Sequence, residues 1–487
     1  MKIAKASMVL LLLLVLAAGG VLANKGRKLP ADAYIKTAKI EVIEAKGDTN
    51  RINTAIAMLD SLIMHYGPRP EAYYWMSKIM IDKTNLQPTP DKKLVFLNQL
   101  VAYIDSLDMT CADKKLNKKL REKCDDWTTE IDTARYVIWG DFYNDGIERL
   151  NGLEDLKKSM SGESDSTTLA EMQSDVEALA DTTRLMFRLA ITVDSTDDRG
   201  LRAMASVFEK TGNYDSAITY LEKAIPFVDN RLDMWTAIAY DYTQKNDYSG
   251  AIKWFQMFVD TALATPGVLD DESNRATVVS IMENLSICEN NVKNYEEAFA
   301  NYRRLLGIDP NNMDALVGVG RYFRQMAITA SDSANAYQKA TNEAKVAEWR
   351  QTRDNLFDSA IVSMQKAVDI RSADPDVENN QSVRREYIGQ LDELSLLLVI
   401  RGRYEEGLQH FLKLVELDPN NTGAWTSVGD CRINLADYKG AAEAYEKVIA
   451  IDPTNKQVLE RLVDLYSAPE ARNEKRKAEI DKMLKKL

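Results

Sequence analysis

The stretch NYEEAFANYRRLLGIDPNN, Asn294 to Asn312, decides the fold of this chain. Its apolar residues recur every three or four positions, which predicts a helix with one buried face. The pattern stops at Asp-Pro-Asn-Asn, because proline cannot continue a helix. Close copies are RYEEGLQHFLKLVELDPNN, Arg403 to Asn421, and DYKGAAEAYEKVIAIDPTN, Asp437 to Asn455. Three copies of one pattern predict a repeated structural unit rather than a site of chemistry.

A fixed register joins these copies to two further ones upstream. Each copy opens with a tyrosine, and a small residue follows three positions later. The five tyrosines are Tyr214, Tyr248, Tyr295, Tyr404 and Tyr438. The first two of them are 34 residues apart, and so are the last two. A second helix pattern precedes the last copy: WTSVGDCRI, Trp425 to Ile433, has Gly429 where two helices would approach closely.

Together these bulky, small, aromatic and proline positions resemble the tetratricopeptide repeat, a helix–turn–helix unit of 34 residues. The resemblance implies an all-α fold, a right-handed α-solenoid of tetratricopeptide-like helix pairs. Each pair has an apolar face on both sides, so neighbouring pairs must stack to bury it.

A chain of 487 residues is too long for one ordinary core, and a repeat array accounts for the length. The segment Ala327–Phe357 lacks Pro and Gly, so we expect it to lengthen both helices of one repeat. Residues 152–167 are polar and are interpreted as a loop. The predicted order is a signal peptide or membrane anchor at 1–23, a divergent helical region at 24–197, repeat units at 198–312, a unit with a long helical insertion at 313–387, repeat units at 388–455, and capping helices at 456–487.

The N-terminus has the three-part form of a secretory signal. Two lysines precede an apolar run, and small residues up to Ala23 form a cleavage pattern before Asn24. The stretch Met8–Ala23 is shorter than the ~20 residues that a spanning helix needs. The sequence therefore favours export to the periplasm or the outer membrane. An uncleaved inner-membrane anchor facing the periplasm is the alternative, and membrane contact is predicted only through this segment.

Export makes disulfides possible. Cys111 and Cys124 would lie ~20 Å apart in one helix, beyond the ~7 Å that a bridge allows. The intervening run Lys114–Lys123, KKLNKKLREK, contains no obvious helix breaker, which argues against a bridge without excluding it. This basic run is either one solvated helix face or an electrostatic docking site. Cys288 and Cys431 occupy equivalent repeat positions and are expected to be small core residues that do not pair.

No motif for catalysis, metal binding or a cofactor is found. His65 and His410, the two histidines, fall in different repeats. The net charge of −12 argues against a nucleic-acid partner, because phosphate binding needs clustered cations. The sequence therefore predicts no enzyme and no cofactor.

Binding is the better prospect. The resemblance implies that first helices line a concave groove, but the Lys-Asn-Asn pattern that grips chaperone carboxylates is absent. Arg321 and Arg324 share a helix face and could meet a carboxylate, or could pair with neighbouring acids. Tyr240 lies on the corresponding face of another first helix.

The segment LSLLLVI, Leu394 to Ile400, is apolar on nearly every side and must be covered. Either other helices of the chain or a partner cover Leu396, Val399 and Ile400. The sequence thus predicts a non-catalytic scaffold that binds proteins of the bacterial cell envelope. A periplasmic protein that binds a peptide or a glycan in its groove is the alternative.

Overall fold

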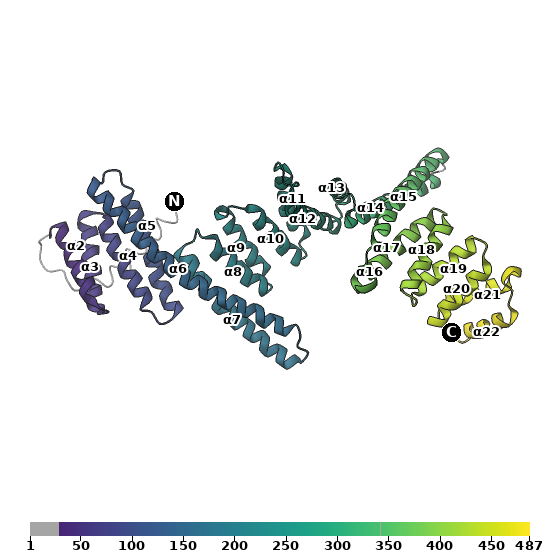
Figure 1. The fold of residues 1–487 in the computed structure, drawn as a ribbon, viewed down its shortest axis with the longest axis horizontal. Coiled ribbons are helices and arrows are strands. Elements are labelled where there is room, and N and C mark those ends of the chain that lie inside the picture. The colour runs from purple at the N-terminus through teal and green to yellow at the C-terminus, as the bar shows by residue number, and fades with distance from the viewer. Residues whose placement is uncertain (1–28, 341) are drawn as a thin grey trace. The chain divides into compact units, whose positions relative to one another are not determined.

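The computed structural model describes residues 29–340 and 342–487. All regular secondary structure in these residues is helical, which confirms the predicted all-α helical repeat fold (Figure 1). Contacts divide the chain into two compact units, Met1–Lys245 and Asn246–Leu487. The predicted signal peptide or anchor at 1–23 lies outside the described residues, and the predicted domain boundaries stay predictions. No helix in the described residues is long and apolar enough to cross a membrane.

The first unit begins with four helices, α2 to α5, which share one apolar core with parts of the long α6–α7 hairpin. Its elements are α2 (Ala31–Ala45), α3 (Thr49–Tyr66), α4 (Pro70–Asn85), α5 (Pro90–Cys111), α6 (Lys118–Met160), α7 (Ser166–Val193), α8 (Asp198–Lys210), α9 (Tyr214–Ala224), η1 (Ile225–Phe227) and α10 (Arg231–Gln244).

The second unit contains the most regular repeats. Its elements are α11 (Tyr248–Ala264), α12 (Glu272–Asn291), α13 (Tyr295–Ile308), α14 (Met313–Lys339), α15 (Glu343–Ser372), α16 (Asp376–Asn379), α17 (Gln381–Ile400), α18 (Tyr404–Leu417), α19 (Thr422–Asn434), α20 (Tyr438–Ile451), α21 (Lys456–Ser467), η2 (Pro469–Ala471) and α22 (Glu474–Leu484).

Glycines allow neighbouring helices to pack closely, as the repeat pattern predicted. A Cβ on Gly429 of α19 would lie 2.3 Å from the ring of Tyr445 in α20. A Cβ on Gly318 of α14 would meet the ring of Tyr302 in α13 at the same 2.3 Å. Both tyrosines are buried, so the missing side chain at each glycine is the space that the aromatic ring occupies.

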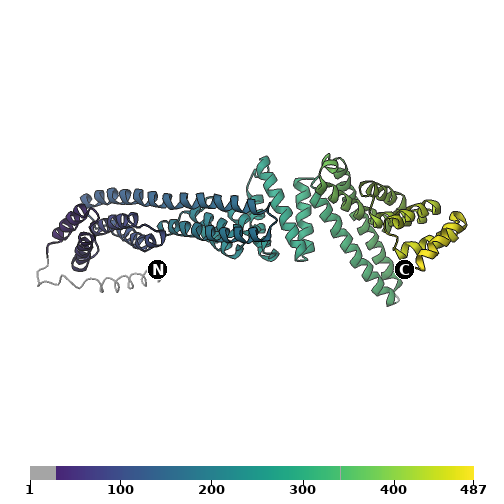
Figure 2. The same cartoon turned by 90° about the horizontal axis from the view of Figure 1, so that it is seen from below.

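Two hairpins are longer than the repeat helices. In the first unit, α6 and α7 pack side by side (Figures 1 and 2). The interpretation of residues 152–167 as a loop holds only for residues 161–165, which connect α6 to α7. It is wrong for the rest, because α6 continues to Met160, with Leu153 fully buried against α7, and α7 begins at Ser166. In the second unit, α14 and α15 form the other hairpin, which confirms that the insertion lengthens both helices.

A helix break separates the first cysteine pair, contrary to the expectation of one continuous helix. Helix α5 ends at Cys111, and α6 begins only after Asn117, whose side chain accepts a hydrogen bond from the Leu120 amide at 2.9 Å. This N-cap makes the start of a new helix favourable. The chain reversal brings the Cα atoms of Cys111 and Cys124 to 5.6 Å, and the two residues form a disulfide.

Candidate functional site

Arg321 lies on α14 and connects it to α17. Its guanidinium donates hydrogen bonds to the carboxylate of Glu393, with an Nη2–Oε1 distance of 2.6 Å and an Nε–Oε1 distance of 3.1 Å. This hydrogen bond raises the pKa of Arg321 above its already high ordinary value. The sequence allowed Arg321 either to meet the carboxylate of a ligand or to pair with a neighbouring acid of the same chain. The structure contains the second arrangement.

Arg324 lies one helical turn beyond Arg321 and is exposed. It forms no ion pair within the described part of the chain. A carboxylate of another molecule could therefore accept two hydrogen bonds from this exposed guanidinium.

The apolar segment of α17 is covered on only part of its circumference. Three leucines of this segment are fully buried, namely Leu394, Leu397 and Leu398. Val399 is half-buried and packs against the second helix of the same repeat. Leu396 and Ile400, however, are 42% and 58% exposed and lie one turn apart on the same helix face. Within the described residues, both side chains are therefore only partly covered.

We call Arg321, Arg324, Leu396, Val399 and Ile400 the α14–α17 surface, after the two helices that the Arg321–Glu393 pair links. It offers two aliphatic side chains and a solvated guanidinium, and it has no nucleophile or general base. Chemically it can bind apolar side chains and a carboxylate. Sequence reasoning missed Glu393, because its pairing with Arg321 joins positions 72 residues apart.

Two other residues on the first-helix faces have different surroundings. Asp430 of α19 accepts hydrogen bonds from Tyr445 and Arg461, so its carboxylate holds α19, α20 and α21 together. Tyr240 is 38% exposed on α10, in the first unit, and is therefore no part of the α14–α17 surface.

Asp241, the residue after Tyr240, is a buried acid that the repeat pattern did not single out. It is 5% exposed, and its Oδ2 atom has no hydrogen-bond partner among the described residues. Burial, and to a smaller extent the charge of Glu209, raises the pKa of Asp241 to about 7.

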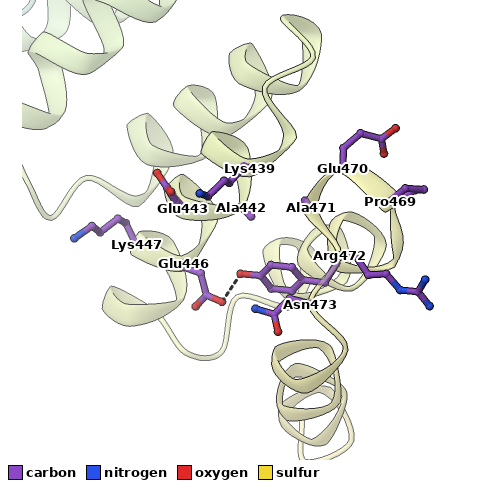
Figure 3. Close-up of a pocket in the computed structure, with 11 residues that line it drawn as sticks. Lys439, Ala442, Glu443, Glu446, Lys447, Pro469, Glu470, Ala471, Arg472 and Asn473 are labelled. Atoms are coloured by element: carbon purple, nitrogen blue, oxygen red, sulfur yellow. Dashed lines mark hydrogen bonds between the residues drawn. The ribbon is translucent and has the colours of Figure 1, made fainter.

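An open cleft of about 670 Å³ lies beside the C-terminal cap (Figure 3). Lys439, Glu443 and Lys447 of α20 line one side, and the turn Pro469–Asn473 lines the other. Acids and bases alternate around the cleft, so its charge selects no class of ligand. At its base Glu446 accepts hydrogen bonds from Tyr466 and from Arg476, which fixes α22 against α20.

A smaller cleft of about 300 Å³ lies in the first unit, where the α7–α8 turn meets α6. Its carboxylates already have partners: Asp197 caps α8 and pairs with Arg199 at 2.6 Å, and Asp194 lies 3.7 Å from Arg135. The Arg199 guanidinium also lies 4.3 Å from the ring centre of Trp139. This arrangement is explained by the packing of α6 against α8.

The histidines and the free cysteines are the remaining candidates for catalysis or metal binding, and their surroundings support neither role. His65 and His410 lie in different units, and burial lowers the pKa of His410. Cys288 and Cys431 are free and buried, as predicted, and burial raises the pKa of each thiol to about 11. Such thiols are unreactive at neutral pH. The described residues contain no group of three or more side chains that could hold a metal ion.

Comparisons with known proteins match parts of the chain. Family models described as tetratricopeptide repeat match residues 203–225 and 393–456. A segment of 69 residues is 36% identical to the Hsp70-Hsp90 organizing protein of Triticum aestivum. The match spans 14% of this chain and only 12% of that protein.

Solved structures resemble larger parts of the chain at low identity. The C-terminal part of a TPR repeat-containing protein from Cytophaga hutchinsonii is 18% identical, with a TM-score of 0.38, over 58% of this chain and 93% of that one. MamA from Desulfovibrio magneticus is 14% identical, with a TM-score of 0.32, over 46% of this chain and 97% of that one.

Both matches cover helix–turn–helix segments, and the match at 393–456 also contains the close contact between Gly429 and Tyr445. Residues 203–225 and 393–456 of this chain are therefore tetratricopeptide repeats.

Proposed function

We propose that this protein is a non-catalytic scaffold that holds protein partners in a bacterial cell envelope, in the periplasm and within a larger assembly. Tetratricopeptide repeat proteins are typically scaffolds for protein–protein interaction. The Hsp70-Hsp90 organizing protein, which one segment resembles, organises other proteins according to its name. The observation that carries the proposal is the α14–α17 surface.

The exposed aliphatic pair supports a protein partner. Leu396 and Ile400 leave roughly half of their side chains in water, on the helix that Arg321 of α14 joins through Glu393. Arg324, one turn beyond Arg321, is also exposed. Burying the exposed half of both side chains is worth about 2 kcal/mol, or roughly a thirtyfold change in Kd. A partner that fits would present apolar side chains next to an Asp or Glu.

Two observations support a place in the envelope. The apolar run at Met8–Ala23 has the form of a secretory signal. The disulfide between Cys111 and Cys124 is a bond that persists in oxidising compartments and is rare in the cytosol.

The test is affinity purification of the full chain from envelopes cross-linked in the native cell, followed by mass spectrometry and a Kd with the purified partner. The variant carries Leu396→Asp and Ile400→Asp. The matched control carries Val362→Asp, because Val362 is an exposed aliphatic side chain of the same unit, on α15.

We expect the native chain and the Val362 control to recover the same envelope protein with equal affinity. The double variant should bind this protein at least thirtyfold more weakly. Equal recovery by all three chains would show that the partner does not use the α14–α17 surface. Recovery of no stable protein partner would refute the scaffold function itself.

A peptide or glycan of the periplasm is the second candidate ligand, supported by the 38% exposure of Tyr240 on α10. In that case Tyr240→Ala would abolish binding of the ligand. The Leu396 and Ile400 variant would leave it unchanged.

A further inference from the structure

The turn between α5 and α6 is a strongly basic end of a helical hairpin. Residues 113–123 contain six Lys or Arg residues and two acids, in a chain whose net charge is −12. All six cationic side chains are exposed, namely Lys114, Lys115, Lys118, Lys119, Arg121 and Lys123. We call residues 113–123 the basic turn.

The basic turn has a defined conformation. The disulfide between Cys111 and Cys124 closes it at its base, and the Asn117 cap starts α6 within it. The Arg121 guanidinium donates a hydrogen bond to the Leu116 carbonyl at 3.1 Å. The cations are therefore presented together without the entropy cost of ordering a flexible loop.

Within residues 113–123, two acids stand against six cations and leave most of the charge uncompensated. Asp113 accepts a hydrogen bond from the Lys115 amide, and Glu122 lies 3.9 Å from Lys118 in a pair of highly exposed side chains. The next acids are Asp108 in the last turn of α5, and Asp125 and Asp126 in α6. Asp125 lies one helical turn from Arg121, whereas Lys118 lies ~10 Å before it along α6, about one Debye length at physiological salt.

The directions of the cations decide which partner they fit. Successive helix residues turn by about 100°, so Lys119 and Lys123, four residues apart, share one side of α6, whereas Lys118 and Arg121 point to other sides. Such a convex end cannot line a groove or follow one row of phosphates along a duplex. It can place several cations on a flat surface at once. The basic turn also contains no aromatic side chain on which a base could stack.

We propose that the basic turn docks the protein, through the end of the α5–α6 hairpin, on a membrane surface of anionic lipid. This contact is electrostatic and reversible, and it is separate from the protein-binding α14–α17 surface. Of the two interpretations of Lys114–Lys123, a solvated helix face or an electrostatic docking site, this proposal chooses the second. The net charge of −12 does not reveal such a site, because it is a sum over the whole chain. Each Lys or Arg near an anionic leaflet strengthens binding about fivefold.

The test measures binding of the full chain to vesicles of phosphatidylcholine with 30% phosphatidylglycerol, and to vesicles of phosphatidylcholine alone, at about 0.15 and 0.5 M salt. The variant replaces four lysines of the basic turn with Gln: Lys114, Lys115, Lys118 and Lys119. The matched control replaces four exposed lysines of the C-terminal cap with Gln: Lys475, Lys482, Lys485 and Lys486. Both variants have the same net charge and keep the N-terminal apolar segment.

We expect the native chain to bind the anionic vesicles at least tenfold more tightly than the neutral ones at 0.15 M salt, and to lose this preference at 0.5 M. The control should keep the preference and the basic-turn variant should lose it. Equal binding by the two variants, or no preference of the native chain for anionic lipid, would overturn the proposal. So would tighter, lysine-dependent binding to duplex DNA in the same buffer. Circular dichroism of both variants checks that they fold.

Discussion

Gly429→Ala tests whether the repeat is held together by glycine–aromatic contact. In the native chain the Gly429 position in α19 lies against the face of Tyr445 in α20, and an added Cβ would be 2.3 Å from the ring. Ordinary carbon–carbon contacts are about 3.5–4.0 Å, so ring and helix must separate by more than 1 Å. The ring cannot simply rotate away, because it is fully buried and its hydroxyl is bonded to Asp430 and Arg461.

Two effects of opposite sign determine the change in stability. Alanine is more favourable than glycine in a helix by about 1 kcal/mol. Overpacking costs about 1–3 kcal/mol, and a ring held at both ends belongs at the upper limit. We therefore expect Gly429→Ala to lower the free energy of unfolding of the second unit by about 2 kcal/mol.

Gly389→Ala is the matched control, since Gly389 lies within α17 of the same unit and an added Cβ would meet nothing within 4 Å. In this control only the preference of alanine over glycine in a helix acts. We therefore expect Gly389→Ala to raise the free energy of unfolding by about 1 kcal/mol. Hydrogen–deuterium exchange of the α19 and α20 amides, together with urea unfolding, measures both changes without assuming that the two units unfold together. If Gly429→Ala were as stabilising as Gly389→Ala, the packing argument would be refuted.

Three further predictions concern other parts of the chain. Burial raises the pKa of Asp241 to about 7, so the folded chain keeps this carboxyl protonated at pH values where the unfolded chain has lost the proton. The contribution of Asp241 to the free energy of unfolding is therefore fully present below pH ~4 and is lost as the pH rises through ~7. Asp241→Asn should remove this dependence and raise the free energy of unfolding at pH 8 by up to about 4 kcal/mol, measured by urea unfolding at pH 4, 6 and 8; unchanged pH dependence would contradict it. Replacing Cys111 and Cys124 by Ser should lower the free energy of unfolding of the first unit by about 3 kcal/mol, the value for closing a loop of this length. The native chain after reduction of its disulfide should show the same loss. Equal stability of the native and Ser chains would mean that the bridge does not form. Intact-mass analysis of the protein from its native envelope should find a chain that begins at Asn24, and a retained Met1 would contradict cleavage.

The sequence by itself determined the repeat and its internal packing. Helical spacing, Gly429, Tyr445 and the Asp-Pro turn all act between residues close in the chain, so one sequence suffices to recognise them. The same local reasoning failed at residues 152–160, where a polar sequence stays helical because α7 covers Leu153. It also failed at Asn117, whose capping interaction breaks the helix without Pro or Gly.

Only the tertiary structure decided which surfaces are open and which charges are paired. Arg321 meets an acid 72 residues away, and the Cys111–Cys124 bridge depends on a chain reversal that the basic run concealed. The composition of the apolar segment Leu394–Ile400 predicted that it would be covered on every side. In the structure, the side chains of Leu396 and Ile400 are exposed. The physical reason is that burial depends on which helices arrive as neighbours, and those neighbours come from distant parts of the chain.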